Sequence, residues 1–175
     1  MVEKQHIFTA FDEDLAILND MMAKMGALAE TQLFASTEAL ITRNPSNLDD
    51  IIKRDKELDN LEAVLNDKVI QIIALRAPLA EDLRRVIVAL KVASTLERVG
   101  DLAKNIAKRN NVILSTSLKT QMLPSIKNLT SMVLKMLYKT LDAYVEVDAK
   151  TALEVMYSDI EVDKLNTVIF QNLIE

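Results

Sequence analysis

The sequence predicts an all-α protein, and three observations support this fold class. Apolar residues recur at steps of three and four along almost the whole chain of 175 residues, which is the spacing of amphipathic helices. The chain has only 2 Gly and 3 Pro, too few for the many tight turns of an all-β protein. Hydrophobic residues make up 50% of the chain, so it can bury a core and is not a disordered chain.

The first helix is expected over residues 11–43. Phe11, Leu18 and Met25 mark its apolar stripe, and acidic residues in its first turn suit the positive end of the helix dipole. A break follows at Pro45, because proline disfavours a helical conformation in the residue before it.

Two further helices are expected on either side of a second proline. The second helix is capped by Ser46 or Asn47 and stops before Pro78. The third begins near Pro78 or Leu79, where proline is tolerated in a first turn, and runs to about Asn110. Both helices carry apolar residues at helical spacing, so each is expected to bury one face.

The last part of the chain predicts two more helices after a polar linker over residues 115–120. Pro124 is expected in the first turn of the fourth helix, which ends near Val145, and the fifth helix runs from about Asp148 to Glu175. No helix-stop signal follows the fifth helix, so we expect one more helix to be missing. The apolar faces of the fourth and fifth helices would then be covered by another copy or left exposed.

An internal repeat supports this expectation. Five of the ten residues in the segment 55–64 recur 104 positions later, in the segment 159–168. The first two helices therefore correspond to the fourth and fifth, and the partner of the third would begin where the chain ends. We predict tandem three-helix bundles, the first over residues 1–114 and an incomplete second over residues 115–175.

Composition excludes several functional classes. With no Cys, the chain can form neither disulfides nor thiolate metal sites, and one His leaves little for a catalytic triad. The net charge of −5 and the seven aromatic residues argue against nucleic-acid binding. No apolar run is long enough for a membrane span, and the N-terminus has no signal core, so a cytoplasmic location is expected.

Three of the predicted helices carry two acids one helical turn apart, so each pair projects from one side of its helix. Oxygen ligands suit magnesium, calcium, manganese or iron, and Asn105 extends the third-helix series by one turn. Gly100 lies within that series, and a glycine inside a helix indicates close approach of another helix or a ligand. The pairs are Asp55 and Asp59, Glu97 and Asp101, and Asp159 and Asp163.

A structural explanation of these acids is open beside the metal site. Asp101 lies about 140° from the centre of the apolar stripe of its helix, which predicts a solvated side chain. Arg98 and Lys104 are each three residues away and could pair with it. Any metal site would be open and on the surface, and a ferritin-like di-iron centre is not expected because the single His6 precedes the first predicted helix.

Basic residues gather around the second proline. Arg76, Arg84 and Arg85 could hold an anion there, although pairing with Glu81 and Asp82 is the simpler interpretation. No glycine-rich phosphate loop exists, so the sequence does not indicate nucleotide hydrolysis or another catalytic activity.

The third predicted helix carries a recognisable motif. The run Leu96-Glu-Arg-Val-Gly-Asp-Leu-Ala-Lys-Asn-Ile-Ala107 and the preceding Pro-Leu-Ala-x-Asp-Leu-Arg, from Pro78 to Arg84, resemble the PhoU family of bacterial phosphate-signalling proteins. The acidic opening between Phe11 and Leu15 is also similar to that family. The resemblance implies two repeated three-helix bundles, which agrees with the repeat found independently.

The resemblance also implies a function and a set of ligands. It implies a non-enzymatic cytoplasmic regulator, often a homodimer, that links the ATPase subunit of the phosphate ABC transporter to the histidine kinase of the phosphate-starvation response. Membrane contact would be indirect, through these partners. The family's acidic motifs can hold divalent or iron cations, and they carry over to Asp55, Asp59, Glu97, Asp101, Asn105, Asp159 and Asp163.

Two alternative functions remain open at this point. The chain could be a metal-binding helical-bundle protein, or it could be an accessory subunit of another phosphate permease. The counterpart of Glu97 and Asp101 in the second repeat is absent, so a second metal site is less well supported by the sequence than the first.

Overall fold

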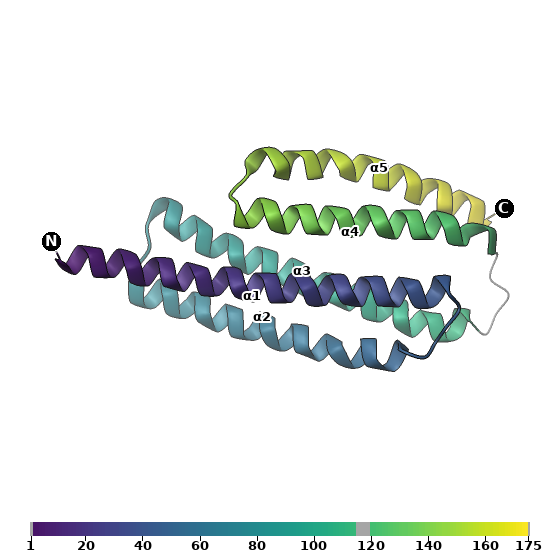
Figure 1. Ribbon diagram of the computed structural model, residues 1–175, viewed down its shortest axis with the longest axis horizontal. Helices are drawn as coiled ribbons and strands as arrows, with labels where there is room; N and C mark the ends of the chain where they lie inside the picture. The colour runs from purple at the N-terminus through teal and green to yellow at the C-terminus, as the bar shows by residue number, and fades with distance from the viewer. Residues whose placement is uncertain (1, 115–119, 175) are drawn as a thin grey trace.

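The computed structural model describes residues 2–114 and 120–174, and every regular element in these ranges is a helix (Figure 1). This confirms the all-α prediction. None of the described helices combines the length and apolar character that crossing a membrane requires. The elements are α1 (Val2–Ile41), α2 (Leu48–Arg76), α3 (Ala80–Ile113), the short 3₁₀ helix η1 (Thr120–Met122), α4 (Leu123–Val145) and α5 (Ala149–Ile174).

The helices form one three-helix bundle and one helical hairpin beside it. α1, α2 and α3 pack against one another along their length, whereas α4 packs against both α5 and α1 (Figure 1). Five helices in this arrangement fit the predicted complete first bundle and incomplete second bundle. The sequence repeat did not indicate that α4 would lie against α1.

The core of the first bundle consists of the predicted stripes. Leucine, methionine, valine and alanine side chains from α1, α2 and α3 are buried together, and half-buried side chains of α4 pack onto them. Burying one such large side chain contributes about 2 kcal/mol, so these stripes supply most of the driving force for assembly. The largest fully buried apolar side chains are Leu18, Met22, Met25, Leu48, Leu58, Leu65, Ile72, Val69 and Val86.

Two glycines allow close helix contacts. A Cβ atom on Gly100 of α3 would overlap the Leu58 side chain of α2 and would lie 3.0 Å from Gln32 Oε1 of α1. The close approach predicted at Gly100 is therefore present, and the bundle's own helices cause it. Gly26 likewise allows a close contact between α1 and α4, because a Cβ atom at this position would overlap the Leu141 side chain.

The helix boundaries differ from the predicted ones at three places. The first helix begins at Val2 and not at residue 11, because no Pro or Gly interrupts the first ten residues, so the predicted placement of His6 before the helix was wrong. Pro78 lies outside α3, which follows an extended Leu79. Asn47 occupies the N-cap position of α2 as expected, but its side chain makes no capping hydrogen bond.

Several helix ends use residues other than glycine in the left-handed conformation. Arg43, Ala77 and Val147 follow α1, α2 and α4 with φ values of 54°, 46° and 54°. Glycine usually occupies this position, because a Cβ atom is crowded there, and a β-branched residue is crowded most. Val147 is therefore a strained residue in the α4–α5 turn. The predicted linker over residues 115–120 lies mostly outside the described residues.

The outer faces of the hairpin leave apolar side chains accessible. The apolar faces of α4 and α5 that were expected to need a cover are half-buried, except Ile169, which is buried. The half-buried residues are Leu129, Met132, Val133, Met136, Leu137, Val155, Val162 and Leu165. A further stripe on α5 is exposed at helical spacing and consists of Leu153, Met156, Tyr157 and Ile160, with exposed fractions of 51, 69, 69 and 52%. The exposed stripe is therefore a different face of α5 from the predicted one, and none of the residues predicted to need a cover is exposed.

Candidate functional site

The predicted acidic residues of α2 and α3 meet across the interface between these helices. Asp55 and Asp59 lie one turn apart on α2, and Glu97 and Asp101 lie one turn apart on α3. These four residues form the acidic cluster. Their burial differs sharply, since Asp55 is 4% exposed, Glu97 is half-buried and Asp59 is exposed. The order follows from position, since Asp55 falls in the apolar stripe of α2 between Ile51 and Leu58.

A lysine joins the two helices at this point. Lys104 Nζ lies 2.5 Å from Asp55 Oδ2 and 2.5 Å from Asp101 Oδ1, so one ammonium group donates hydrogen bonds to both carboxylates. These hydrogen bonds raise the pKa of Lys104 above its ordinary value, against the opposing effect of burial. The predicted pairing of Lys104 with Asp101 is confirmed. Asp101 is not fully solvated, because 45% of its side chain is exposed.

Glu97 experiences the remaining negative charge of the cluster. Burial raises the pKa of its carboxyl, and the charge of Asp101 raises it further. Glu62, Asp59 and Asp55 act in the same direction. The cluster is therefore a region of negative potential that Lys104 neutralises only in part, and a cation near Glu97 would be stabilised there.

The other predicted metal ligands are separate from this cluster. Asn105 is exposed on the next turn of α3. Asp159 and Asp163 are exposed on α5, where Asp159 borders an open cavity of about 450 Å³ between α4 and α5. Among the side chains that the structure describes, no three from His, Cys, Asp or Glu are grouped closely enough to hold a metal ion.

A second buried ion cluster was not predicted. Asp14 of α1 is 8% exposed and accepts hydrogen bonds from Lys68 Nζ at 2.7 Å and from Arg76 Nε at 2.9 Å, both on α2. Burial acts to raise the pKa of Asp14, but the two cationic donors outweigh it and hold the pKa below its ordinary value. The expected pairing of Arg76 with Glu81 or Asp82 was wrong, because Arg76 turns toward α1.

Comparisons with known proteins agree with this architecture. The PhoU domain family matches residues 22–109, which comprise the second half of α1, all of α2 and most of α3. A "Phosphate-specific transport system accessory protein PhoU homolog" from Zymomonas mobilis is 43% identical over 169 residues, covering 97% of this chain and 71% of the relative. This chain belongs to the PhoU family. The acidic cluster thus lies inside the matched PhoU domain.

More distant PhoU proteins support the same assignment. A homologue from Thermotoga maritima is 30% identical over all 175 residues of this chain and 74% of its own length. The crystal structure of PhoU from Pseudomonas aeruginosa superimposes with a TM-score of 0.89 at 28% identity, covering 94% of this chain and 78% of that one. The PhoU fold therefore extends over α4 and α5 as well as the first bundle.

Proposed function

We propose that this PhoU-family chain regulates phosphate uptake and keeps the phosphate-starvation response off when phosphate is plentiful. It does so as an adaptor between the ATPase subunit of the phosphate ABC transporter and the sensor histidine kinase. The observation that carries the proposal is 43% identity over 97% of the chain to a protein named as an accessory of the phosphate-specific transport system.

The proposed mechanism is conformational and not catalytic. The relatives' names describe accessory proteins, which supports a regulatory part in transport. The best-buried charged groups, Asp14 and Asp55, are ion-paired to lysine or arginine of a neighbouring helix, where they stabilise the bundle. The long helix faces of the bundle and hairpin would serve as docking surfaces for partner proteins.

A pull-down experiment tests the adaptor. The tagged full chain is mixed with the purified ATPase subunit, with the kinase, and with both together. Retention of both partners is the expected result. Retention of the transporter subunit alone would reject the kinase link while leaving an accessory role in transport, and retention of neither would reject the whole proposal. A parallel mixture with a different phosphate permease tests the alternative accessory function, which retention of that permease alone would favour.

Self-association is a second part of the proposal. The exposed apolar stripe of α5 (Leu153, Met156, Tyr157 and Ile160) supports a homodimer, because stripes of this kind mark protein contacts. Sedimentation of the full chain should give a dimer, and Met156→Glu with Tyr157→Glu should give a monomer. Asn166→Glu, an exposed polar position on the same helix, is the control. A compact wild-type monomer would contradict dimerisation.

Metal binding in the acidic cluster stays a prediction. The raised pKa of Glu97 supports it, because a divalent cation would relieve repulsion among the carboxylates. As placed, however, the residues do not fit a bound ion, since the Lys104 ammonium already lies between Asp55 and Asp101. Elemental analysis of protein purified without chelator, compared with Asp55→Asn plus Asp101→Asn, tests the prediction. Equal metal in both proteins would reject it.

A further inference from the structure

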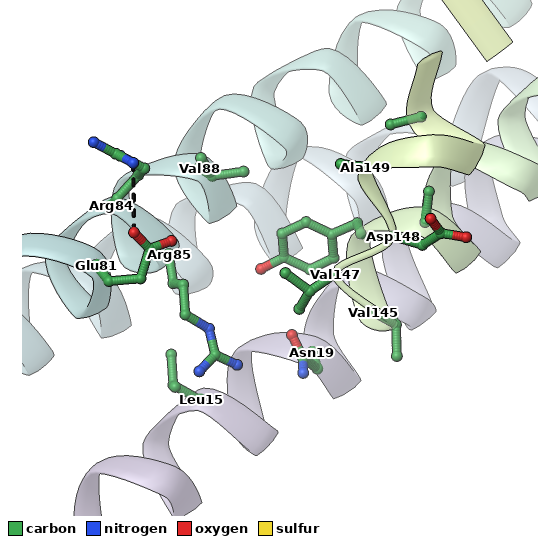
Figure 2. A pocket seen from close by; sticks show the side chains of 13 residues that line it. Leu15, Asn19, Glu81, Arg84, Arg85, Val88, Val145, Val147, Asp148 and Ala149 are labelled. Atoms are coloured by element: carbon green, nitrogen blue, oxygen red, sulfur yellow. Dashed lines mark hydrogen bonds and ion pairs between the residues drawn. The ribbon is translucent and has the colours of Figure 1, made fainter. Parts of the chain in front are cut away.

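A cavity of about 260 Å³ lies where the hairpin meets the first bundle. Its walls come from three separate parts of the chain: the first half of α1, the beginning of α3 and the turn between α4 and α5 (Figure 2). Most of the wall is apolar, with Leu15 on α1, Val88 on α3 and Val145 and Val147 at the turn. The cavity is distinct from the acidic cluster and plays no part in the proposed function.

Two acids and two arginines line this cavity, but only one acid and one arginine among them form an ion pair. Arg84 Nη1 pairs with Glu81 Oε2 at 3.4 Å, and the Asp148 carboxylate accepts hydrogen bonds from the backbone N–H groups of Lys150 and Thr151 at the start of α5. Both acids in the wall are therefore satisfied. Arg85 has no ion pair or hydrogen bond within the described part of the chain, and Figure 2 shows its guanidinium turned toward Leu15 and Asn19 while Arg84 turns to Glu81.

Two neutral polar groups complete one side of the cavity. The Asn19 amide and the Tyr144 hydroxyl line it, and neither makes a hydrogen bond to the described residues. Burial raises the pKa of Tyr144, and the charge of Arg85 acts in the opposite direction, so the guanidinium lies close enough to influence the hydroxyl. Asn19, Arg85 and Tyr144 thus offer hydrogen-bond donors from three different helices, with one net positive charge among them.

We propose that this cavity binds a small organic anion whose carboxylate or phosphate group contacts Arg85, Asn19 and Tyr144 and whose apolar body lies against Leu15 and the valines of the wall. An anion would give the Arg85 guanidinium an ion-pair partner, and an apolar body would displace water from apolar surface. Because the donors come from α1, α3 and α4, the bound anion would stabilise the contact between the hairpin and the first bundle. Two of the three arginines noted in the sequence form ion pairs within the protein, Arg76 with Asp14 and Arg84 with Glu81. Arg85 is therefore the arginine that is available to a ligand.

Calorimetric titration of the full chain with four probes tests this inference. Phenyl phosphate and benzoate carry both an anionic group and an apolar body, inorganic phosphate carries the charge alone, and phenol carries the body alone. Saturable binding of phenyl phosphate or benzoate is expected, at least about tenfold tighter than either single-feature probe. The better of the two anions identifies the head group. Equal binding of inorganic phosphate would show an adventitious ion only and would overturn the proposal.

Matched variants locate the binding site. Arg85→Gln should weaken binding of the preferred probe by about tenfold or more, because it removes a charge-assisted hydrogen bond. Arg84→Gln, one residue away and engaged with Glu81, should change it by less than about twofold. Tyr144→Phe, which keeps the ring and loses the hydroxyl, should weaken it by about threefold. Equal losses in both arginine variants, or no saturable binding by the wild-type chain, would reject the site. Unchanged circular dichroism of each variant confirms that folding is intact.

Discussion

Removing the Lys104 ammonium tests how the acidic cluster holds α2 and α3 together. Lys104→Met keeps most of the length and apolar stem of the side chain and deletes the charge. Asp55 is 4% exposed, and Lys104 is its only hydrogen-bond or ion-pair partner among the described residues. The variant therefore leaves a buried carboxylate without a counter-charge, which is the most costly consequence of breaking such a pair.

The magnitude follows from the burial of the three groups. Breaking a fully buried pair by deleting one partner costs about 3–5 kcal/mol, whereas an exposed pair is worth less than about 1 kcal/mol. Exposed fractions of the side chains are 6% for Asp55, 21% for Lys104 and 45% for Asp101, so only the Asp55 part approaches the buried limit. We expect Lys104→Met to lower the free energy of unfolding by about 2–3 kcal/mol, or the melting temperature by about 5–10 °C.

Urea unfolding followed by circular dichroism gives the measurement. Arg98→Met is the control, because Arg98 is exposed on the same helix and has no described ion pair; its cost should be below about 0.5 kcal/mol. Adding Asp55→Asn to Lys104→Met should recover part of the loss, since the second change removes the stranded charge. Equal stability of Lys104→Met and Arg98→Met would refute the reasoning.

The pH dependence adds an independent check. The pKa of Lys104 is raised in the folded protein, so its contribution is fully present below the ordinary lysine value near 10.4 and is lost as the pH rises through the folded value. Lys104→Met lacks this contribution at every pH. The stability deficit of the variant relative to wild type should therefore shrink as the pH rises above about 10.5. A deficit that stays constant from about pH 8 to about pH 11.5 would contradict this assignment.

Four other substitutions test the packing. Because the pKa of Asp14 is lowered in the folded protein, its ion pairs stabilise the folded state above about pH 4, and this contribution is lost as the pH falls through the pKa of the folded state. Asp14→Asn should therefore lose less stability than wild type when both are acidified. Gly100→Ala should lower the free energy of unfolding, measured in urea, by about 1–2 kcal/mol, because the cost of steric overlap with Leu58 exceeds the gain in helix propensity. A more stable variant would disprove the close contact. Val147→Gly should raise the melting temperature by about 2–4 °C by relieving the left-handed strain, and a lower melting temperature would contradict that strain. Gln32→Met should raise the free energy of unfolding by about 1 kcal/mol, since both polar atoms of the Gln32 amide are buried without a described hydrogen-bond partner. A decrease of more than about 1 kcal/mol would contradict the absence of such a partner.

Most of the helical architecture could be predicted from the sequence, because helix periodicity is a local property. The break at Pro45 and the first-turn position of Pro124 both follow from proline geometry, and both are present. The burial of two polar residues could also have been predicted, since Asp14 and Gln32 fall within the apolar stripe of α1. A buried polar side chain needs a hydrogen-bond partner, so these positions would have predicted a partner on another helix for each.

Contacts between helices were harder to predict. The packing of α4 against α1 at Gly26 depends on how two repeats meet, which no single helix pattern specifies. The same limit applies to Lys104, whose pairing with Asp101 is local along α3, whereas its bond to Asp55 requires the register between α2 and α3. The ligand cavity is a still longer-range feature, because three separated segments form it.

Regulation of the phosphate response is tested most directly by deleting the gene in its native host and measuring a phosphate-starvation reporter during growth in excess phosphate. The proposed regulator predicts high reporter expression in the deletion strain and restored repression when the intact gene is returned. Repression that is unchanged by the deletion would contradict the proposed function.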